Sequence, residues 1–216
     1  MSDQKRIEEL VEIIEKNTAE RDFFGATYKE VPYLKEIKKI IEKETNEDKD
    51  SLLFKYQTYL YLGEQYYSLG RFTISADSNK KALLTAVILF NKYQYKSDII
   101  GDLFFRLLRD RNHYVDDDCK DILKILKEAP LIEEECINEI YQKRMNRRRN
   151  LKSDPVEMSE EYLNVIDEVE EKIEKNRKHY GMVSCYEVWD LKHRFLLEKG
   201  INWKSPAVLN PRVIFD

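Results

Sequence analysis

Apolar residues recur at helical spacing along the whole chain, and this pattern constrains the fold more than any other feature of the sequence. An α-helix turns the same face inward every 3.6 residues, whereas a half-buried strand does so every second residue. Ile7, Leu10, Val11 and Ile14 show the helical spacing near the start of the chain. Only six glycines and five prolines interrupt 216 residues, which argues against sandwiches and barrels with many turns. The sequence therefore predicts an all-α fold.

Capping residues, glycines and prolines divide this pattern into nine predicted helices. They cover approximately residues 7–14, 34–41, 50–69, 71–91, 98–109, 116–127, 131–149, 158–178 and 183–199. No intervening segment is long enough to act as an interdomain linker, so we expect a single helical-repeat domain over residues 1–200.

Residues 201–216 differ from the rest of the chain. Pro206 and Pro211 disfavour a regular helix, while Trp203, Leu209 and Phe215 are too apolar to be left free in water. We therefore expect an extended C-terminal strap that docks on the helices.

Charge and cysteine content narrow the classes of partner. Lys and Arg total 37 against 41 Asp and Glu, so the net charge of −4 gives no global reason to expect nucleic acid. Neither common glycine-rich nucleotide loop is present, and the charged segment that begins the sequence does not resemble the apolar core of a signal peptide. The longest strongly apolar stretch, residues 82–90, is about half the length of a membrane span. Three widely spaced cysteines suit reduced thiols. These features predict a cytoplasmic protein that uses no membrane and no cofactor.

Two segments of the chain resemble each other. Residues 62–69 and 100–107 each contain a glycine preceded by an apolar residue, followed by an acid, and then by two adjacent aromatics. A glycine inside a helix costs about 1 kcal/mol relative to alanine. Its recurrence predicts that Gly63 and Gly101 lie where a neighbouring helix approaches closely.

These residues resemble the tetratricopeptide repeat (TPR), a helix–turn–helix unit of about 34 residues. The matching positions are Tyr59, Leu62, Gly63, Tyr66, Gly70, Phe72, Ala82 and Leu83. Ser75 and Asn79 depart from the pattern, where a small alanine and an aromatic are usual. The resemblance implies one good repeat over about residues 56–89 and a degenerate one over about residues 94–127, in an array of antiparallel helix pairs.

In the family this resemblance points to, the first helix of each repeat lines a concave groove that binds an extended peptide. The corresponding positions are Gln57, Leu60, Glu64, Tyr67, Ser68, Tyr95, Asp98, Asp102, Phe105 and Arg106. The acids among them would favour a basic ligand, while Tyr67 and Phe105 either supply apolar contact area or belong to the core. The resemblance thus implies a non-catalytic adaptor that binds a protein or peptide.

A basic segment offers an alternative function, the binding of RNA or another anion. It consists of Lys143, Arg144, Arg147, Arg148, Arg149 and Lys152, with no acid between them. Acidic segments flank it on both sides, so neutralisation of these neighbours and of its own helix C-terminus is the simpler interpretation.

Catalytic and metal-binding patterns are weak. No two histidines have the i, i+4 spacing of metal ligands, and Cys185 and His193 lie eight positions apart. Glu168, Glu171 and Glu174 have the spacing used by helical nucleotide hydrolases, yet Lys175 stands where a further carboxylate would strengthen a metal site. We therefore expect no metal site and no enzyme, with a carboxylate-dependent hydrolase as a third hypothesis.

Overall fold

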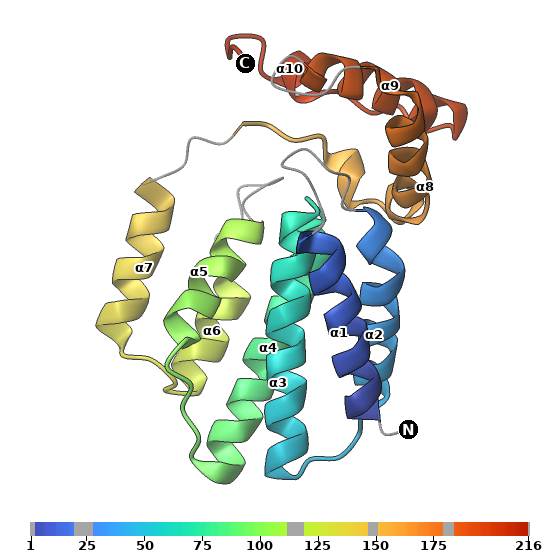
Figure 1. Ribbon diagram of the computed structural model, residues 1–216. Helices are drawn as coiled ribbons and strands as arrows, with labels where there is room; N and C mark the ends of the chain where they lie inside the picture. Colours follow the sequence, from blue (N-terminus) through green and yellow to red (C-terminus); the bar gives the residue numbers. More distant parts are fainter. Residues whose placement is uncertain (1–2, 20–27, 112–118, 147–150, 179–183, 216) are drawn as a thin grey trace. The chain divides into compact units, whose positions relative to one another are not determined.

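The computed structural model describes residues 3–19, 28–111, 119–146, 151–178 and 184–215, and every regular element in these ranges is a helix (Figure 1). The α-helices are α1 (Asp3–Ala19), α2 (Val31–Lys43), α3 (Lys49–Ser68), α4 (Phe72–Tyr93), α5 (Ile100–Arg111), α6 (Lys120–Glu128), α7 (Glu134–Asn146), α8 (Glu160–Asn176), α9 (Ser184–Glu198) and α10 (Pro206–Leu209). Two 3-10 turns, η1 (Tyr28–Glu30) and η2 (Pro155–Met158), complete the list. The all-α prediction is confirmed, and each of the nine expected helices is present with shifted ends.

The helices divide into two compact units. Unit 1 comprises residues 1–3 and 34–150, and unit 2 comprises residues 4–33 and 151–216. The predicted division into a domain over residues 1–200 and a strap over residues 201–216 stays a prediction. None of the described helices has the length and apolar character needed to cross a bilayer.

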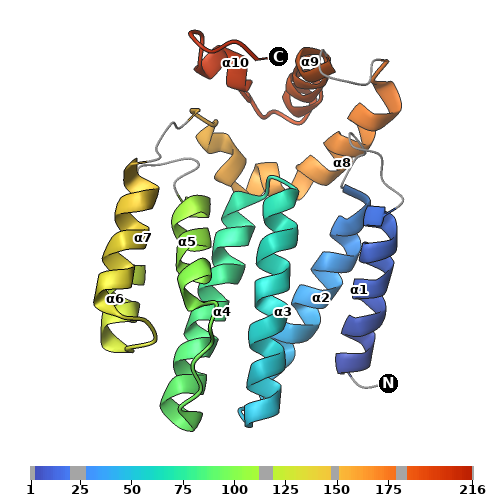
Figure 2. The same ribbon diagram turned by 60° about the vertical axis from the view of Figure 1, so that its left-hand side comes forward.

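The antiparallel pair α3–α4 forms the centre of unit 1. Asp48 caps the start of α3 by accepting a hydrogen bond from the backbone N–H of Ser51 at 3.0 Å. Gly70 ends the helix with a φ of +70°, a conformation that glycine adopts without strain. The chain then reverses, so that Leu62 of α3 and Leu83 of α4 are both fully buried. The helices of unit 1 stand side by side with roughly aligned axes (Figure 2).

Helix α5 extends this pair by packing closely on α4 and on α7. Gly101 lies inside α5, where an added β-carbon would meet Ile140 of α7 at 3.4 Å. Helix α6 is joined to its neighbours through Asp121, which forms ion pairs with Lys80 of α4 at 2.8 Å and with Arg111 of α5 at 2.5 Å. Helix α5 therefore packs on the helix that precedes it, α4, and on the later helix α7.

Unit 2 has its own apolar core, built mainly by α8 and α9. Ser159 caps α8 by accepting from the N–H of Tyr162, and the buried face of that helix follows at helical spacing. The core comprises Tyr162, Ile166, Val169, Ile173, Phe195, Leu196, Ile201 and Trp203. The last two belong to the tail, so residues beyond α9 complete this core.

The tail is not extended throughout, and the expectation that its prolines would forbid a helix is wrong at Pro206. Ser205 accepts a hydrogen bond from the N–H of Val208, and Pro206 occupies the first turn of α10, where its missing N–H costs nothing. Trp203 is only 2% exposed. Phe215 is half-buried and meets the ring of Trp189 edge-on at 5.1 Å.

Candidate peptide-binding surface

Helices α3 and α5 run parallel in unit 1 and are bridged by side chains at three levels. The hydroxyl of Tyr56 donates to Ser97 Oγ at 2.9 Å, Arg106 pairs with Glu64 at 3.2 Å, and the guanidinium carbon of Arg109 lies 3.2 Å from the centroid of the Tyr67 ring. Each partner near α5 follows its α3 partner by 41 or 42 positions, so the register between the helices is constant. The sequence motif, in contrast, repeats after 38 positions. The second copy on α5 is therefore displaced by about one helical turn relative to the α3 residues that it would match in the motif.

The ion pair between Glu64 and Arg106 brings together two of the predicted groove residues. Their side chains are 48% and 30% exposed, so the pair lies at the surface. It neutralises Glu64, whose charge we expected to be available to a ligand. The acids that remain available on this surface are Asp98 and Asp102, both exposed and without an ion-pair partner among the described residues.

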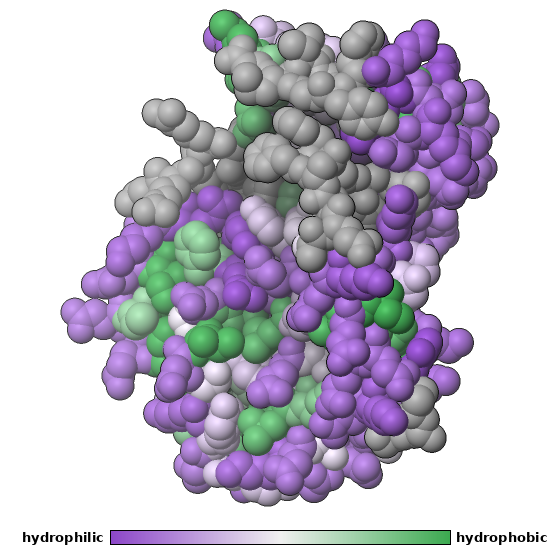
Figure 3. Space-filling model, viewed as in Figure 1, coloured by the Kyte–Doolittle hydropathy of each residue, from purple (hydrophilic) through white to green (hydrophobic). Residues whose placement is uncertain are grey.

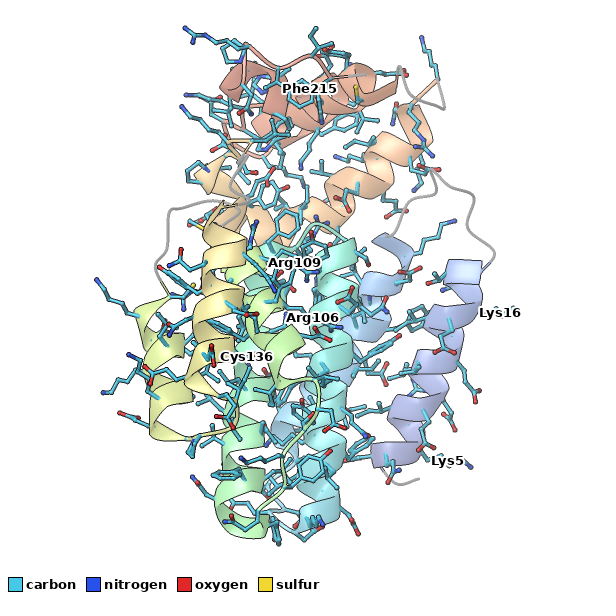
Figure 4. All side chains as sticks on the ribbon, turned by 90° about the vertical axis from the view of Figure 1, so that its left-hand side faces the viewer. Lys5, Lys16, Arg106, Arg109, Cys136 and Phe215 are labelled. Atoms are coloured by element: carbon cyan, nitrogen blue, oxygen red, sulfur yellow. The ribbon has the colours of Figure 1, made fainter. Side chains whose placement is uncertain are left out.

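Arg109 belongs to the same surface, although it is absent from the sequence-based set. Its guanidinium lies over the face of Tyr67, a cation–π contact, and its Nε donates to Asp110 Oδ1 at 2.8 Å. The side chain is 18% exposed, and its buried Nη2 has no hydrogen-bond partner within the described ranges. Arg106 and Arg109 follow Asp102 at i+4 and i+7, so all three share one face of the helix. This spacing is the sequence signal that would have placed Arg109 among the predicted groove residues. Arg106 and Arg109 lie one turn apart on α5 (Figure 4).

Behind this surface, a buried polar cluster joins α3, α4 and α5. Asp110 Oδ2 accepts from Ser75 Oγ at 2.6 Å and from Asn79 Nδ2 at 2.8 Å. Ser75 Oγ also lies 2.7 Å from the carbonyl oxygen of Gly63. Ser75 and Asn79 both depart from the repeat pattern, and both supply hydrogen-bond partners for one carboxyl group on the next helix.

Burial raises the pKa of Asp110, and the hydrogen bonds from Ser75, Arg109 and Asn79 oppose that rise. Asp110 is only 1% exposed, so its charged form has lost almost all contact with water. The hydroxyl of Ser75 has one proton for two acceptors, the carboxylate and the Gly63 carbonyl. A proton on Asp110 would satisfy both, because the carboxyl group could then donate to Ser75 while Ser75 donates to Gly63.

The remaining predicted groove residues lie on α3 and α5, except for Tyr95, which lies in the connection between α4 and α5. Gln57 and Ser68 are exposed, whereas Leu60, Tyr95 and Phe105 are half-buried. Tyr67 and Phe105 are both intermediate in exposure, so each contributes to the core and to the surface. Hydrophobic side chains gather on the face where α5 lies between α3 and α7 (Figure 3). A role in binding stays a prediction for these residues.

The basic segment is only partly described, because Arg147, Arg148 and Arg149 lie outside the described residues. Lys143 pairs with Glu139 at 3.3 Å on the exposed side of α7. Arg144 is half-buried, and its Nη2 lies 3.5 Å from the carbonyl oxygen of Arg109, which places it at the end of the α5 surface. Lys152 is exposed, and its backbone bonds to the side chain of Asn210. Anion binding by this segment stays a prediction.

The weaker catalytic candidates have structural partners. His193 Nδ1 lies 2.6 Å from the carbonyl oxygen of Trp203, so this nitrogen carries the proton and ties α9 to the tail. The three glutamates all pair with basic side chains. Glu168 pairs with Lys199 and Lys172, Glu171 pairs with Lys175, and Glu174 pairs with Arg177. Within the part of the chain that the structure describes, no three metal-ligating side chains gather as a site.

Comparison of the chain with protein-family models, with curated proteins and with solved structures finds no match. The helices and their packing define an all-helical protein that is compatible with a helical repeat.

Proposed function

We propose that the surface formed by α3 and α5 binds an extended segment of another protein, and that the chain acts as a TPR-like adaptor. The observation that carries this proposal is the constant register of the two helices. Contacts from Tyr56 to Ser97, from Glu64 to Arg106 and from Tyr67 to Arg109 hold the first helices of successive repeat-like units parallel. Parallel first helices are the arrangement in which such repeats present a continuous binding face.

The packing of the α3–α4 pair supports the repeat interpretation. The positions that match the repeat pattern in α3, namely Tyr59, Leu62, Gly63 and Tyr66, are all buried, as are Ala82 and Leu83 in α4. The pattern therefore coincides with the faces that pack. What remains outside the core on α3 and α5 is a mixed stripe of apolar and charged side chains, the composition expected of a peptide-binding face.

The adaptor is proposed to work in the cytoplasm. Cys119, Cys136 and Cys185 are all free thiols, and Cys119 is buried. Free thiols suit a reducing compartment.

Selection from a displayed library of random dodecapeptides tests the proposed function. Leu60→Glu with Phe105→Glu places two carboxylates on the proposed surface, and Leu84→Glu on α4 is the matched control, because Leu84 is already 42% exposed. Peptides selected on the wild-type chain should bind the control and lose at least about tenfold in affinity for the double variant. Equal binding to all three proteins would place the site elsewhere, and retention of RNA in place of peptide would favour the basic segment.

A further inference from the structure

The two oxygens of the buried Asp110 carboxyl group have different neighbours. Oδ2 accepts hydrogen bonds from Ser75 Oγ at 2.6 Å and from Asn79 Nδ2 at 2.8 Å, both of which are fully buried on α4. Oδ1 accepts from the Nε of Arg109 at 2.8 Å. One carboxyl group therefore connects the polar interior of unit 1 with an arginine at the α3–α5 surface.

Arg109 covers the ring of Tyr67 while it pairs with Asp110. The central carbon of its guanidinium lies 3.2 Å from the ring centroid, and the arginine side chain is only 18% exposed. A charge that is largely removed from water is tolerated when a counter-charge is in contact with it, and loss of the counter-charge leaves it uncompensated. The position of Arg109 over Tyr67 therefore depends on the negative charge of Asp110.

The neighbouring helices supply no second counter-charge to Arg109 among the described residues. On α4, the side chains that contact Asp110 are uncharged, and on α3 the phenol of Tyr67 lies beneath the guanidinium. The other charged groups around this pair are either paired or positive. They are Glu64 of α3 with Arg106, Asp121 of α6 with Arg111, and Arg144 of α7, which lies 3.5 Å from the Arg109 carbonyl oxygen.

Asp110 can take up a proton without losing its contacts on α4. Ser75 Oγ lies within hydrogen-bonding distance of two acceptors, Asp110 Oδ2 and the carbonyl oxygen of Gly63, but its hydroxyl supplies one proton. A proton on Oδ2 serves the first contact and leaves the hydroxyl to serve the second. Burial raises the pKa of Asp110, which brings this protonation closer to neutral pH.

From this arrangement we propose that Asp110 and Arg109 form a pH-sensitive switch at the α3–α5 surface. While Asp110 is ionised, it holds Arg109 over Tyr67. When Oδ2 takes up a proton, Arg109 loses its counter-charge, and its guanidinium moves from the ring into water. Protonation inside the core thus uncovers an aromatic ring at the surface. The switch acts on the surface to which we assign peptide binding, but it does not depend on that function.

NMR of the arginine Nε–H groups in the isotope-labelled full chain tests the switch. Arg109→Lys identifies the resonance of Arg109 by its disappearance. At neutral pH this proton should be shifted by the ring current of Tyr67 and should exchange slowly with water. Between about pH 7.5 and about pH 3.5, its exchange rate relative to that of exposed arginines should rise at least about tenfold, and the ring-current shift should be lost.

Two matched substitutions identify the group that titrates. Asp110→Asn carries no charge at any pH, so the Arg109 resonance should show the exposed position throughout and no transition. Asp121→Asn makes the same change at the partner of Arg111, and Arg109 should keep the wild-type transition. Circular dichroism at each pH monitors the folding of all three proteins.

Several outcomes would overturn the switch. One is an Arg109 resonance that keeps its position and its protection over the whole range, and another is a transition that persists in Asp110→Asn. A change of all arginine resonances together with the circular dichroism would show unfolding of the chain, and no switch in the folded protein. If Asp110→Asn does not fold, Tyr67→Leu decides, because a shift of Arg109 that survives this substitution would show that Arg109 does not cover the ring.

Discussion

The side-chain oxygen of Asn79 occupies the space that a β-carbon at Gly63 would need. The carbon atom of the same amide would lie only 2.7 Å from that β-carbon, well inside a normal van der Waals contact. Asn79 is fully buried and bonded to Asp110, so it has little freedom to move aside. The close approach of α3 and α4 at this level therefore depends on the absence of a side chain.

Gly63→Ala is expected to destabilise the protein by about 1–3 kcal/mol, because overpacking outweighs the better helix propensity of alanine. Gly101→Ala is the matched control. Its β-carbon would meet Ile140 at 3.4 Å, an ordinary contact, so this change should be neutral or stabilising by up to about 1 kcal/mol. Urea unfolding of both variants measures the difference. Equal stabilities would show that α3 and α4 do not approach as described.

Ionisation of the buried Asp110 should lower the free energy of unfolding as the pH rises. Its folded pKa is raised, so the folded protein binds this proton more tightly than the unfolded chain, whose carboxyl titrates near 3.8. Stability is therefore lost as the pH rises from 3.8 to the folded pKa. Asp110→Asn should remove this part of the pH dependence while retaining the shape of the side chain. Urea midpoints measured from pH 3.5 to 7 test this, and an unchanged profile in the variant would contradict it.

Asp110→Leu should be more damaging than Asp110→Asn. It leaves the buried amide of Asn79 and the Nε of Arg109 without their acceptor. The expected cost is about 3 kcal/mol, since each unsatisfied buried group costs about 1–3 kcal/mol. A melting temperature like that of Asp110→Asn would show that the cluster contributes packing alone.

The contribution of Asp121 to stability should depend on pH in the opposite direction. Burial raises its pKa, but hydrogen bonds and charges from Lys80 and Arg111 outweigh this effect and hold the pKa at about 2. The stabilisation is complete above the unfolded value of 3.8 and is lost as the pH falls toward 2. Because the carboxylate is 42% exposed, solvent screening limits the contribution to about 1 kcal/mol. Asp121→Asn should flatten the loss of stability between pH 4 and pH 2.5 in urea titrations.

Trp203 should be essential to the core of unit 2. It is 2% exposed, its Nε1 donates to Glu157 at 2.7 Å, and the ammonium of Lys192 lies 4.6 Å from its ring centroid. Trp203→Ala should cost about 3–5 kcal/mol through the cavity that it leaves. Glu157→Gln keeps an acceptor for the indole N–H and should cost much less. Similar chemical-denaturation profiles for the two variants would contradict the buried position of Trp203.

Local features of the sequence predict the helices of this protein well. Among the described residues, apolar periodicity identifies every helix from α1 to α9, and the recurring Gly63 and Gly101 indicate where other elements approach. The single turn of α10 is not predicted, because Pro206 suggests a helix break, whereas in the structure Ser205 caps the turn and Pro206 lies at its start. The position of a proline within a helix decides which of these effects it has.

Features that depend on the register between helices are not accessible from the sequence alone. Ser75 and Asn79 read as departures from a repeat because their partner, Asp110, follows 35 and 31 positions later. Glu64 reads as a free acid because its pairing with Arg106 depends on how α3 and α5 align. Compensating substitutions of this kind become visible only once the helices are placed side by side.

The antiparallel bonding between the segment before α8 and the tail has a consequence for the order of folding. Lys152 bonds to Asn210 across 58 positions, and Asp154 accepts from the N–H of Lys204 across 50. Closing loops of this size requires a long search, whereas Ser75 reaches Gly63 across only 12 positions. We therefore expect the α3–α4 pair to form early and the closure of unit 2 to be a late event, during which Trp203 and the surface that it covers are still exposed to water.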